Sequence, residues 1–308
     1  MTARVPRYFD VDWDRFDPWR IQPVRHSVQD HPLLQPDQLV ELGKRLERES
    51  LVRTHTSDAT ASTSFDAAPR LHPNKMTAEE TLSHIQSAKA WMSLLNVQTD
   101  PLYRGFVREV LDDVQPEVEK RDPGMCYRAG WIFVSSPKTV TPFHMDTEHN
   151  FILQMRGRKT VYVWEHDDLE TVSEKARNRF HGRHSRELMT WDESFRKRAK
   201  VFHLEPGMGA YMPSTSPHLV ENGEEPSITV SFTYYTNSTR RKRLLHKLHD
   251  LMEDRGFDPP PVNPKAPFDA LVYMLGTAAF GTKRLLRRLG GGKVYSDRVA
   301  YAHAEIGV

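Results

Sequence analysis

The feature of this sequence that most constrains its fold is a succession of short β-type runs between Cys126 and Tyr235. Gly, Pro and Asn residues separate the runs, and such residues favour turns between strands. The runs read CYRAGWIFVSS, NFILQM, KTVYVWE, KVFHLEPG, GAYMPS, HLVENG and SITVSFTYY. Closely spaced short strands of this kind predict an antiparallel barrel or a double-sheet jelly roll.

Helical patterns flank this block on both sides. Residues 36–49, PDQLVELGKRLERE, repeat leucine at helical spacing. Thr77 and Glu80 form a capping-box pattern, and Asp100 and Pro101 suit the N-cap and first position of another helix. Beyond the last strand, STRRKRLLHKLHDLMEDRG and FDALVYMLGTAAFGTKRLLRRLG predict two further helices. The expected class is mainly β, with helical extensions at both ends of the barrel.

Three segments follow from these patterns. Residues 1–76 are expected to wrap over the body, with one helix and a long loop over 50–75. Residues 77–236 are expected to form the barrel, with a charged insertion over 166–200 that folds as surface helices. Residues 237–308 are expected to form a helical extension. We therefore expect one catalytic barrel with extensions and not two independent domains.

The composition excludes several classes of protein. Cys126 is the only cysteine, which excludes an internal disulfide and a cysteine-based zinc site. The net charge of +2 is too small to predict nucleic-acid binding by itself. The first residues lack the apolar core of a signal peptide, and no apolar run is long enough to span a membrane. The sequence therefore predicts a cytoplasmic protein with no nucleic-acid partner and no membrane span.

The stretch TPFHMDTEHNFILQMRGRK carries His144 and Asp146 two positions apart. On a strand, side chains at this spacing project to the same side. His218 follows a turn-like segment near the end of the β-rich block. Two imidazoles and one carboxylate form a facial triad that suits non-haem Fe(II) and leaves positions open for co-substrate and oxygen. The alternative is a hydrogen-bonded surface pair, with His218 as an ordinary loop residue.

Lys159 begins the otherwise apolar run KTVYVW. An unpaired buried ammonium is costly, so this side chain must reach solvent or an anion. A dicarboxylate co-substrate that chelates iron at one end could place its other carboxylate against Lys159. Thr141 could then donate a second hydrogen bond to the same carboxylate.

These motifs resemble the jumonji-C (JmjC) and cupin-like family of Fe(II)- and 2-oxoglutarate-dependent oxygenases, especially the branch with the asparaginyl hydroxylases. TPFHMDTEHNFILQMRGRK is similar to that branch's iron strand and co-substrate strand. LEPGMGAYMPSTSPHLVEN and SITVSF are similar to its second iron strand and the strand that follows. The resemblance covers residues 77–236, most firmly 127–165 and 202–235. It implies a double-stranded β-helix (a jelly-roll or cupin barrel) that uses Fe(II), 2-oxoglutarate and O2.

The resemblance also implies roles for individual residues of this chain. The iron-ligand positions fall on His144, Asp146 and His218. The positions that hold or neighbour the co-substrate fall on Thr141, Asn150, Lys159 and Ser231. The chain departs from many relatives at Met208, after EPG, and at Ser216 and Pro217, before the second histidine; these departures bear on substrate access.

The implied activity is hydroxylation of a protein side chain, a peptide or a small molecule, ahead of N-demethylation by the same chemistry. Two alternatives come from other classes: a cupin-like module that binds a metal or ligand without catalysis, and a cupin enzyme that works without 2-oxoglutarate. The basic insertion is either a lid or a solvated helix face. The last helix packs on the barrel, rests on an anionic membrane surface or, as we prefer, forms a homodimer.

Overall fold

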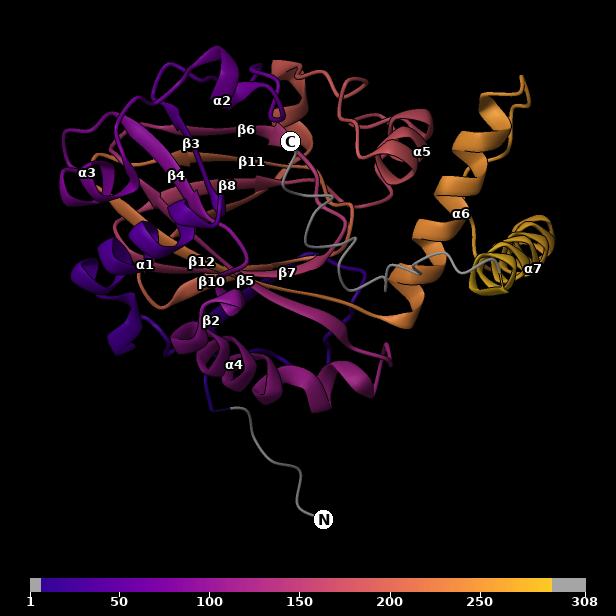
Figure 1. The fold of residues 1–308 in the computed structure, drawn as a ribbon, viewed down its shortest axis with the longest axis horizontal. Helices are drawn as coiled ribbons and strands as arrows, with labels where there is room; N and C mark the ends of the chain where they lie inside the picture. Colours follow the sequence, from indigo (N-terminus) through magenta and orange to yellow (C-terminus); the bar gives the residue numbers. More distant parts are fainter. Residues whose placement is uncertain (1–6, 290–308) are drawn as a thin grey trace.

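The computed structural model describes residues 7–289, with side chains described as far as residue 279 (Figure 1). Two antiparallel sheets form the body, as the sequence predicts. The larger has eight strands in the order β1-β2-β10-β7-β12-β5-β4-β3, and the smaller has four in the order β6-β11-β8-β9. Figure 1 shows β6, β11 and β8 above β12, β10 and β7 of the larger sheet.

The strands have the following bounds. In the larger sheet they are β1 Phe9–Asp10, β2 Gln22–His26, β3 Val52–Thr56, β4 Ala90–Leu94, β5 Cys126–Ser135, β7 His149–Arg156, β10 Met208–Met212 and β12 Ser227–Tyr235. In the smaller sheet they are β6 Val140–His144, β8 Lys159–Val163, β9 Lys200–Leu204 and β11 His218–Asn222.

The helices flank this body, as predicted. They are α1 Pro36–Arg48, α2 Ala68–Leu71, α3 Ala78–Ser83, α4 Pro101–Glu119, α5 Glu174–Arg183, α6 Asn237–Glu253 and α7 Pro267–Leu289. Short 3-10 turns lie at Pro32–Leu34, Val97–Thr99 and Glu193–Arg198. The predicted capping box of Thr77 and Glu80 begins α3, and Asp100 caps α4.

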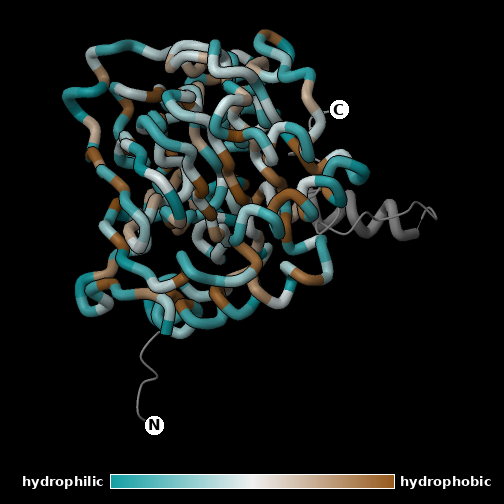
Figure 2. The backbone as a smooth tube through the Cα atoms, turned by 90° about the vertical axis from the view of Figure 1, so that its left-hand side faces the viewer, coloured by the Kyte–Doolittle hydropathy of each residue, from teal (hydrophilic) through white to brown (hydrophobic). Residues whose placement is uncertain are grey.

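The main core lies on the outer face of the larger sheet, where α1 and α4 pack. Leu39, Leu42 and Leu46 of α1 are buried, as their spacing predicts. The ring of Phe106 on α4 meets the ring of Phe232 on β12 edge to face, at 5.5 Å between centroids. Burial of each such side chain stabilises the fold by about 1.5–3 kcal/mol. Figure 2 shows hydrophobic segments gathered within the body and hydrophilic ones on its outer turns.

The N-terminal segment was predicted to wrap over the body, and it also adds strands to the larger sheet. β2 pairs with β10, and β3 pairs with β4 at the edge of the larger sheet. The prediction of a long loop over 50–75 was therefore wrong in part, because β3 and α2 fall inside it. β3 is hard to recognise because its sequence, VRTHT, is polar and only one of its residues is buried. The boundaries 1–76, 77–236 and 237–308 stay predictions.

The charged insertion 166–200 lies between β8 and β9 and folds into α5 and a 3-10 turn. One of its histidines, His181, does not face solvent. Its side chain is buried, and its ring stacks on that of His246 from α6, with centroids 4.7 Å apart. None of the helices within the described residues is long and apolar enough to cross a membrane.

Candidate metal centre

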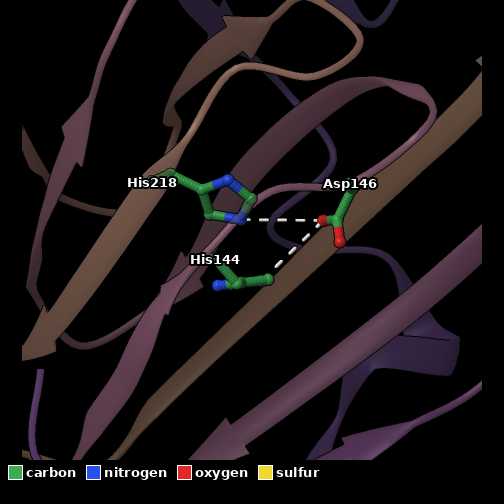
Figure 3. A group of neighbouring side chains, drawn as sticks. All are labelled: His144, Asp146 and His218. Atoms are coloured by element: carbon green, nitrogen blue, oxygen red, sulfur yellow. Dashed lines mark ion pairs between the residues drawn. The ribbon is translucent and has the colours of Figure 1, made fainter. Parts of the chain in front are cut away.

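His144, Asp146 and His218 meet at the end of the smaller sheet (Figure 3). β6 ends at His144, and Asp146 follows in the next turn, so the two do not share a strand. His218 begins β11 directly opposite His144. Asp146 Oδ2 lies 3.9 Å from His144 Nε2 and 3.6 Å from His218 Nε2. One ligand atom from each residue lies within 4.8 Å of the other two, so the three can hold one metal ion.

The backbone fixes which imidazole nitrogen faces this centre. His144 Nδ1 lies 2.8 Å from the carbonyl oxygen of Pro142, and His218 Nδ1 lies 3.1 Å from that of Ser216. An Nδ1–H that donates to a carbonyl leaves the lone pair on Nε2. Metal-binding histidines in proteins are usually held in this way.

Burial shapes the charges of the triad. Burial, followed by the neighbouring His218, lowers the pKa of His144 well below its usual value, and burial also lowers the pKa of His218. Both rings are therefore neutral and can act as ligands. Burial raises the pKa of Asp146, because the desolvated carboxylate needs more positive charge around it than Arg186 alone provides. A divalent cation would supply that charge, so the donor set fits a metal.

Arg186, from the segment after α5, contacts Oδ1 of Asp146, the carboxylate oxygen that is not the one next to the two histidines. Its Nη2 lies 3.3 Å from Asp146 Oδ1, and its Nε donates to the Met145 carbonyl at 3.0 Å. Its Nη1 donates to Asp66 Oδ1 at 2.8 Å. The guanidinium therefore links the loop around residue 66 to the metal centre. Sequence reasoning missed Arg186 because it stands among several basic residues with no local pattern to distinguish it.

A cavity of about 1300 Å³ opens beside the triad. Its lining includes His144 and Asp146 and the predicted co-substrate neighbours Asn150 and Ser231. Asn150 Oδ1 and Ser231 Oγ are buried and have no hydrogen-bond partner among the residues that the structure describes. Unsatisfied buried polar atoms call for a ligand or ordered water.

Thr141 and Lys159 lie on the same inner face as the two histidines. Residues 218, 220 and 222 of β11 alternate to one face of the sheet. His218 pairs with His144, Val220 with Thr141, and Asn222 with Lys159. The register therefore turns all these side chains toward the interior.

Lys159 is a buried cation without a counter-charge. It is 5% exposed, and no acidic side chain of the described residues forms an ion pair with it. Burial alone lowers its pKa to about 7. A group of this kind is expected where an anion binds.

Sequence reasoning also missed the part of the cavity wall formed by the N-terminal segment. Arg53 of β3 and Phe65 of the following loop both line the cavity. The Phe65 ring stacks on the His144 ring with centroids 3.8 Å apart. These positions lay in a stretch that was expected to be loop, and only the three-dimensional pairing of β3 with β4 brings them to the site.

Comparison with known proteins gives the following similarities. A search of curated proteins found no match. Among solved structures, Escherichia coli YcfD matches at 15% identity and a TM-score of 0.48, over 88% of this chain and 68% of that one. YcfD, a ribosomal oxygenase, in complex with cobalt and 2-oxoglutarate matches at 18% identity and a TM-score of 0.42, over 89% and 67%.

A more distant similarity is to the DMSP lyase DddQ from Ruegeria pomeroyi DSS-3. It has 12% identity and a TM-score of 0.23, over 35% of this chain and 38% of that one. The family model described as a cupin-like domain matches residues 24–240. That match includes both sheets apart from β1 and the first two residues of β2, and it contains the triad and Lys159. The chain belongs to the cupin-like domain family.

Proposed function

We propose that this chain is an Fe(II)- and 2-oxoglutarate-dependent oxygenase. The observation that carries the proposal is the combination, on one inner face, of a metal-binding triad and a buried cation without a counter-charge. A module that only binds a metal has no need of Lys159. A cupin enzyme that works without 2-oxoglutarate has no need of it either.

Each residue has a defined part. His144, Asp146 and His218 hold Fe(II) through two Nε2 atoms and a carboxylate oxygen. Lys159 and Thr141 bind the far carboxylate of 2-oxoglutarate, and Asn150 and Ser231 offer their unsatisfied polar atoms close to the metal. When bound, the iron and 2-oxoglutarate together activate O2, with succinate and carbon dioxide as co-products.

The protein supplies orientation of the metal ligands. The carbonyl groups of Pro142 and Ser216 fix the two imidazoles, and Arg186 fixes the carboxylate. Phe65 covers one face of His144. Ligands held in this way keep their geometry when co-substrate and substrate exchange.

The finer parts of the proposal concern substrate and assembly. We expect hydroxylation of a protein side chain, peptide or small molecule ahead of N-demethylation. The homodimer through the C-terminal helices stays a prediction, motivated by Leu271, Met274 and Leu275, which α7 leaves exposed. Its test is the mass in solution: a monomeric mass would contradict it.

The experiment that tests the proposal is the dependence of succinate formation on 2-oxoglutarate concentration, with Lys159→Ala beside the wild type. Loss of a charge-assisted hydrogen bond is worth about 1.5–3 kcal/mol, so KM for 2-oxoglutarate should rise by about tenfold or more. Lys197→Ala, at an exposed position of the insertion, is the matched control and should leave KM unchanged. An unchanged KM in Lys159→Ala would remove Lys159 from the co-substrate site.

A further inference from the structure

Three neighbouring strands of the larger sheet carry a second polar group on the cavity wall. Arg53 on β3 lies directly opposite Ser93 on β4, and Ser93 lies directly opposite Phe133 on β5. All three residues line the cavity that also contains His144 and Asp146. Residues directly opposite on paired strands share a face, so these side chains stand side by side in front of the metal centre.

Two of these side chains have unused hydrogen-bonding atoms. Within residues 7–279, Arg53 Nε and Ser93 Oγ are buried and have no hydrogen-bond partner. A guanidinium offers five N–H donors and a hydroxyl offers one. Arg53 uses one nitrogen to donate to the Phe65 carbonyl, and its guanidinium lies 4.2 Å from the centroid of the Phe65 ring. That contact does not use Nε, which stays buried without a hydrogen-bond partner among the described residues.

Arg53 forms no ion pair with a carboxylate of the residues that the structure describes. Burial, followed by the charge of Arg186, lowers its pKa to about 10, so the group is cationic at neutral pH. Asp66 and Asp146 lie near enough to favour that charge. Both carboxylates form ion pairs with Arg186, and neither forms one with Arg53 within the described residues. Within the described part of the chain, the cavity wall therefore carries a guanidinium that has no ion-pair partner.

The walls around this cation are aromatic. The rings of Trp91 and Phe133 have centroids 5.7 Å apart, and both line the cavity. Phe65 borders the same space. A ligand that fits here presents an anionic group to Arg53 and Ser93 and an apolar body to the rings.

We propose that Arg53 and Ser93 form the substrate-binding subsite for a carboxylate, and that the substrate is an organic acid with an apolar body. The inference rests on the proposed oxygenase function and adds the substrate class to it. Arg53 and Ser93 bind the carboxylate, Trp91 and Phe133 hold the apolar part, and the carbon to be oxidised faces the triad. The carboxylate belongs either to a free small acid or to an acidic side chain of a peptide.

Isothermal titration with two pairs of probes tests the subsite and separates the two sources. One pair is 3-phenylpropanoate and 3-phenylpropanamide; the other is a blocked peptide with Glu beside Phe and its Glu→Gln counterpart. Binding is measured on the full chain with Fe(II) and saturating 2-oxoglutarate, without oxygen. We expect one acidic probe to bind more tightly than its neutral partner by about tenfold or more.

Two variants assign that preference to the subsite. Ser93→Ala and Arg53→Met should each weaken binding of the acidic probe and leave the neutral probe unchanged. Arg53→Met could disturb Phe65, because Arg53 donates a hydrogen bond to the Phe65 carbonyl. The Ser93 hydroxyl forms no hydrogen bond with Phe65, so Ser93→Ala tests the subsite without that disturbance. Arg25→Met, at an exposed position of β2, is the matched arginine control and should change nothing.

The outcomes separate the subsite from the oxygenase function. No preference for either acid, or a preference that survives both variants, would overturn the subsite. Competition between 2-oxoglutarate and the acidic probe would also overturn it, because Arg53 would then belong to the co-substrate site. Failure of Fe(II) and 2-oxoglutarate to produce their visible absorption band would instead refute the oxygenase, and the titration would still report on the subsite.

Discussion

His144 and His218 face each other across paired strands, with ring centroids 4.0 Å apart and both Nε2 atoms directed at Asp146. Residues far apart in the sequence are thus brought together by the register of β6 and β11. This relationship makes a metal centre from two strand ends and a turn. It also predicts how the centre responds when a part is removed.

Replacement of His144 or Asp146 by Ala should reduce 2-oxoglutarate turnover by more than about 100-fold, because loss of a supporting contact alone costs 10–100-fold. The fold should persist, since the largest hydrophobic cluster lies on the outer face of the larger sheet, away from the triad. Succinate formation and thermal unfolding measure the two effects. His203→Ala, at an exposed position of β9, is the control. Turnover retained in either variant would exclude that residue from the iron site.

Arg186→Met should weaken metal binding by about 10–100-fold, because Asp146 loses the group that orients it. Arg186→Lys should recover only part of the loss, since an ammonium cannot reproduce a planar fork with three separate partners. Titration of the protein with Co(II), followed by its absorption, gives the affinity directly. Arg198→Met, which removes an ion pair to Asp168, controls for loss of a surface guanidinium. Equal affinities in all variants would contradict the role of Arg186.

The affinity for 2-oxoglutarate should fall as pH rises above about 7, where burial has placed the pKa of Lys159. A bound carboxylate stabilises the protonated form of Lys159. Above the pKa of the unliganded protein, binding of 2-oxoglutarate therefore requires uptake of a proton by Lys159, and the affinity falls. The limiting slope is about tenfold in affinity per pH unit. Anaerobic titrations across this range would show the slope in the wild type and its loss in Lys159→Met. A slope that persists in the variant would assign the titration to another group.

Stability should fall as pH drops below about 6.5, because His181 and His246 are buried in neutral form. Burial lowers the pKa of both rings well below 6.5. The unfolded chain then binds protons that the folded chain excludes, so acid favours unfolding. His181→Phe keeps a stacking ring and removes one proton site. It should reduce the slope of unfolding free energy against pH by up to about 1.4 kcal/mol per unit.

Denaturant unfolding between about pH 5 and pH 8 measures these slopes. His203→Phe is the exposed control on β9. Since other buried histidines also contribute, the comparison is between variant and wild type rather than between absolute values. Equal slopes for His181→Phe and the wild type would show that the stacked pair does not titrate on unfolding.

The sequence predicts the barrel from its alternating runs, and it predicts the triad from one compact motif together with His218 after a turn near the end of the β-rich block. Alternating apolar runs reveal the strands, and His144, Asp146 and Lys159 stand close together in one compact motif. The outer wall of the site depends instead on long-range pairing. Arg53 and Ser93 become neighbours only when β3 joins the sheet, and a five-residue polar strand carries almost no signal.

The C-terminal helices show the same limit. On α6, Leu251 is exposed while His246 and His249 are buried. Helical periodicity predicted the helix correctly. The face that α5 covers is polar, with hydrogen bonds such as that between His246 Nδ1 and Asn178 Oδ1 at 2.8 Å. A buried polar face cannot be distinguished from a solvated one by hydropathy alone.

The most direct test of the central claim is anaerobic absorption spectroscopy of the protein with Fe(II) and 2-oxoglutarate. Chelation of iron by the co-substrate produces a visible metal-to-ligand charge-transfer band. The account predicts a band that needs both additions in the wild type, and that requires higher 2-oxoglutarate concentrations in Lys159→Ala. A folded, metal-loaded protein that gives no band would contradict it and would favour a cupin-like module or an enzyme that works without 2-oxoglutarate.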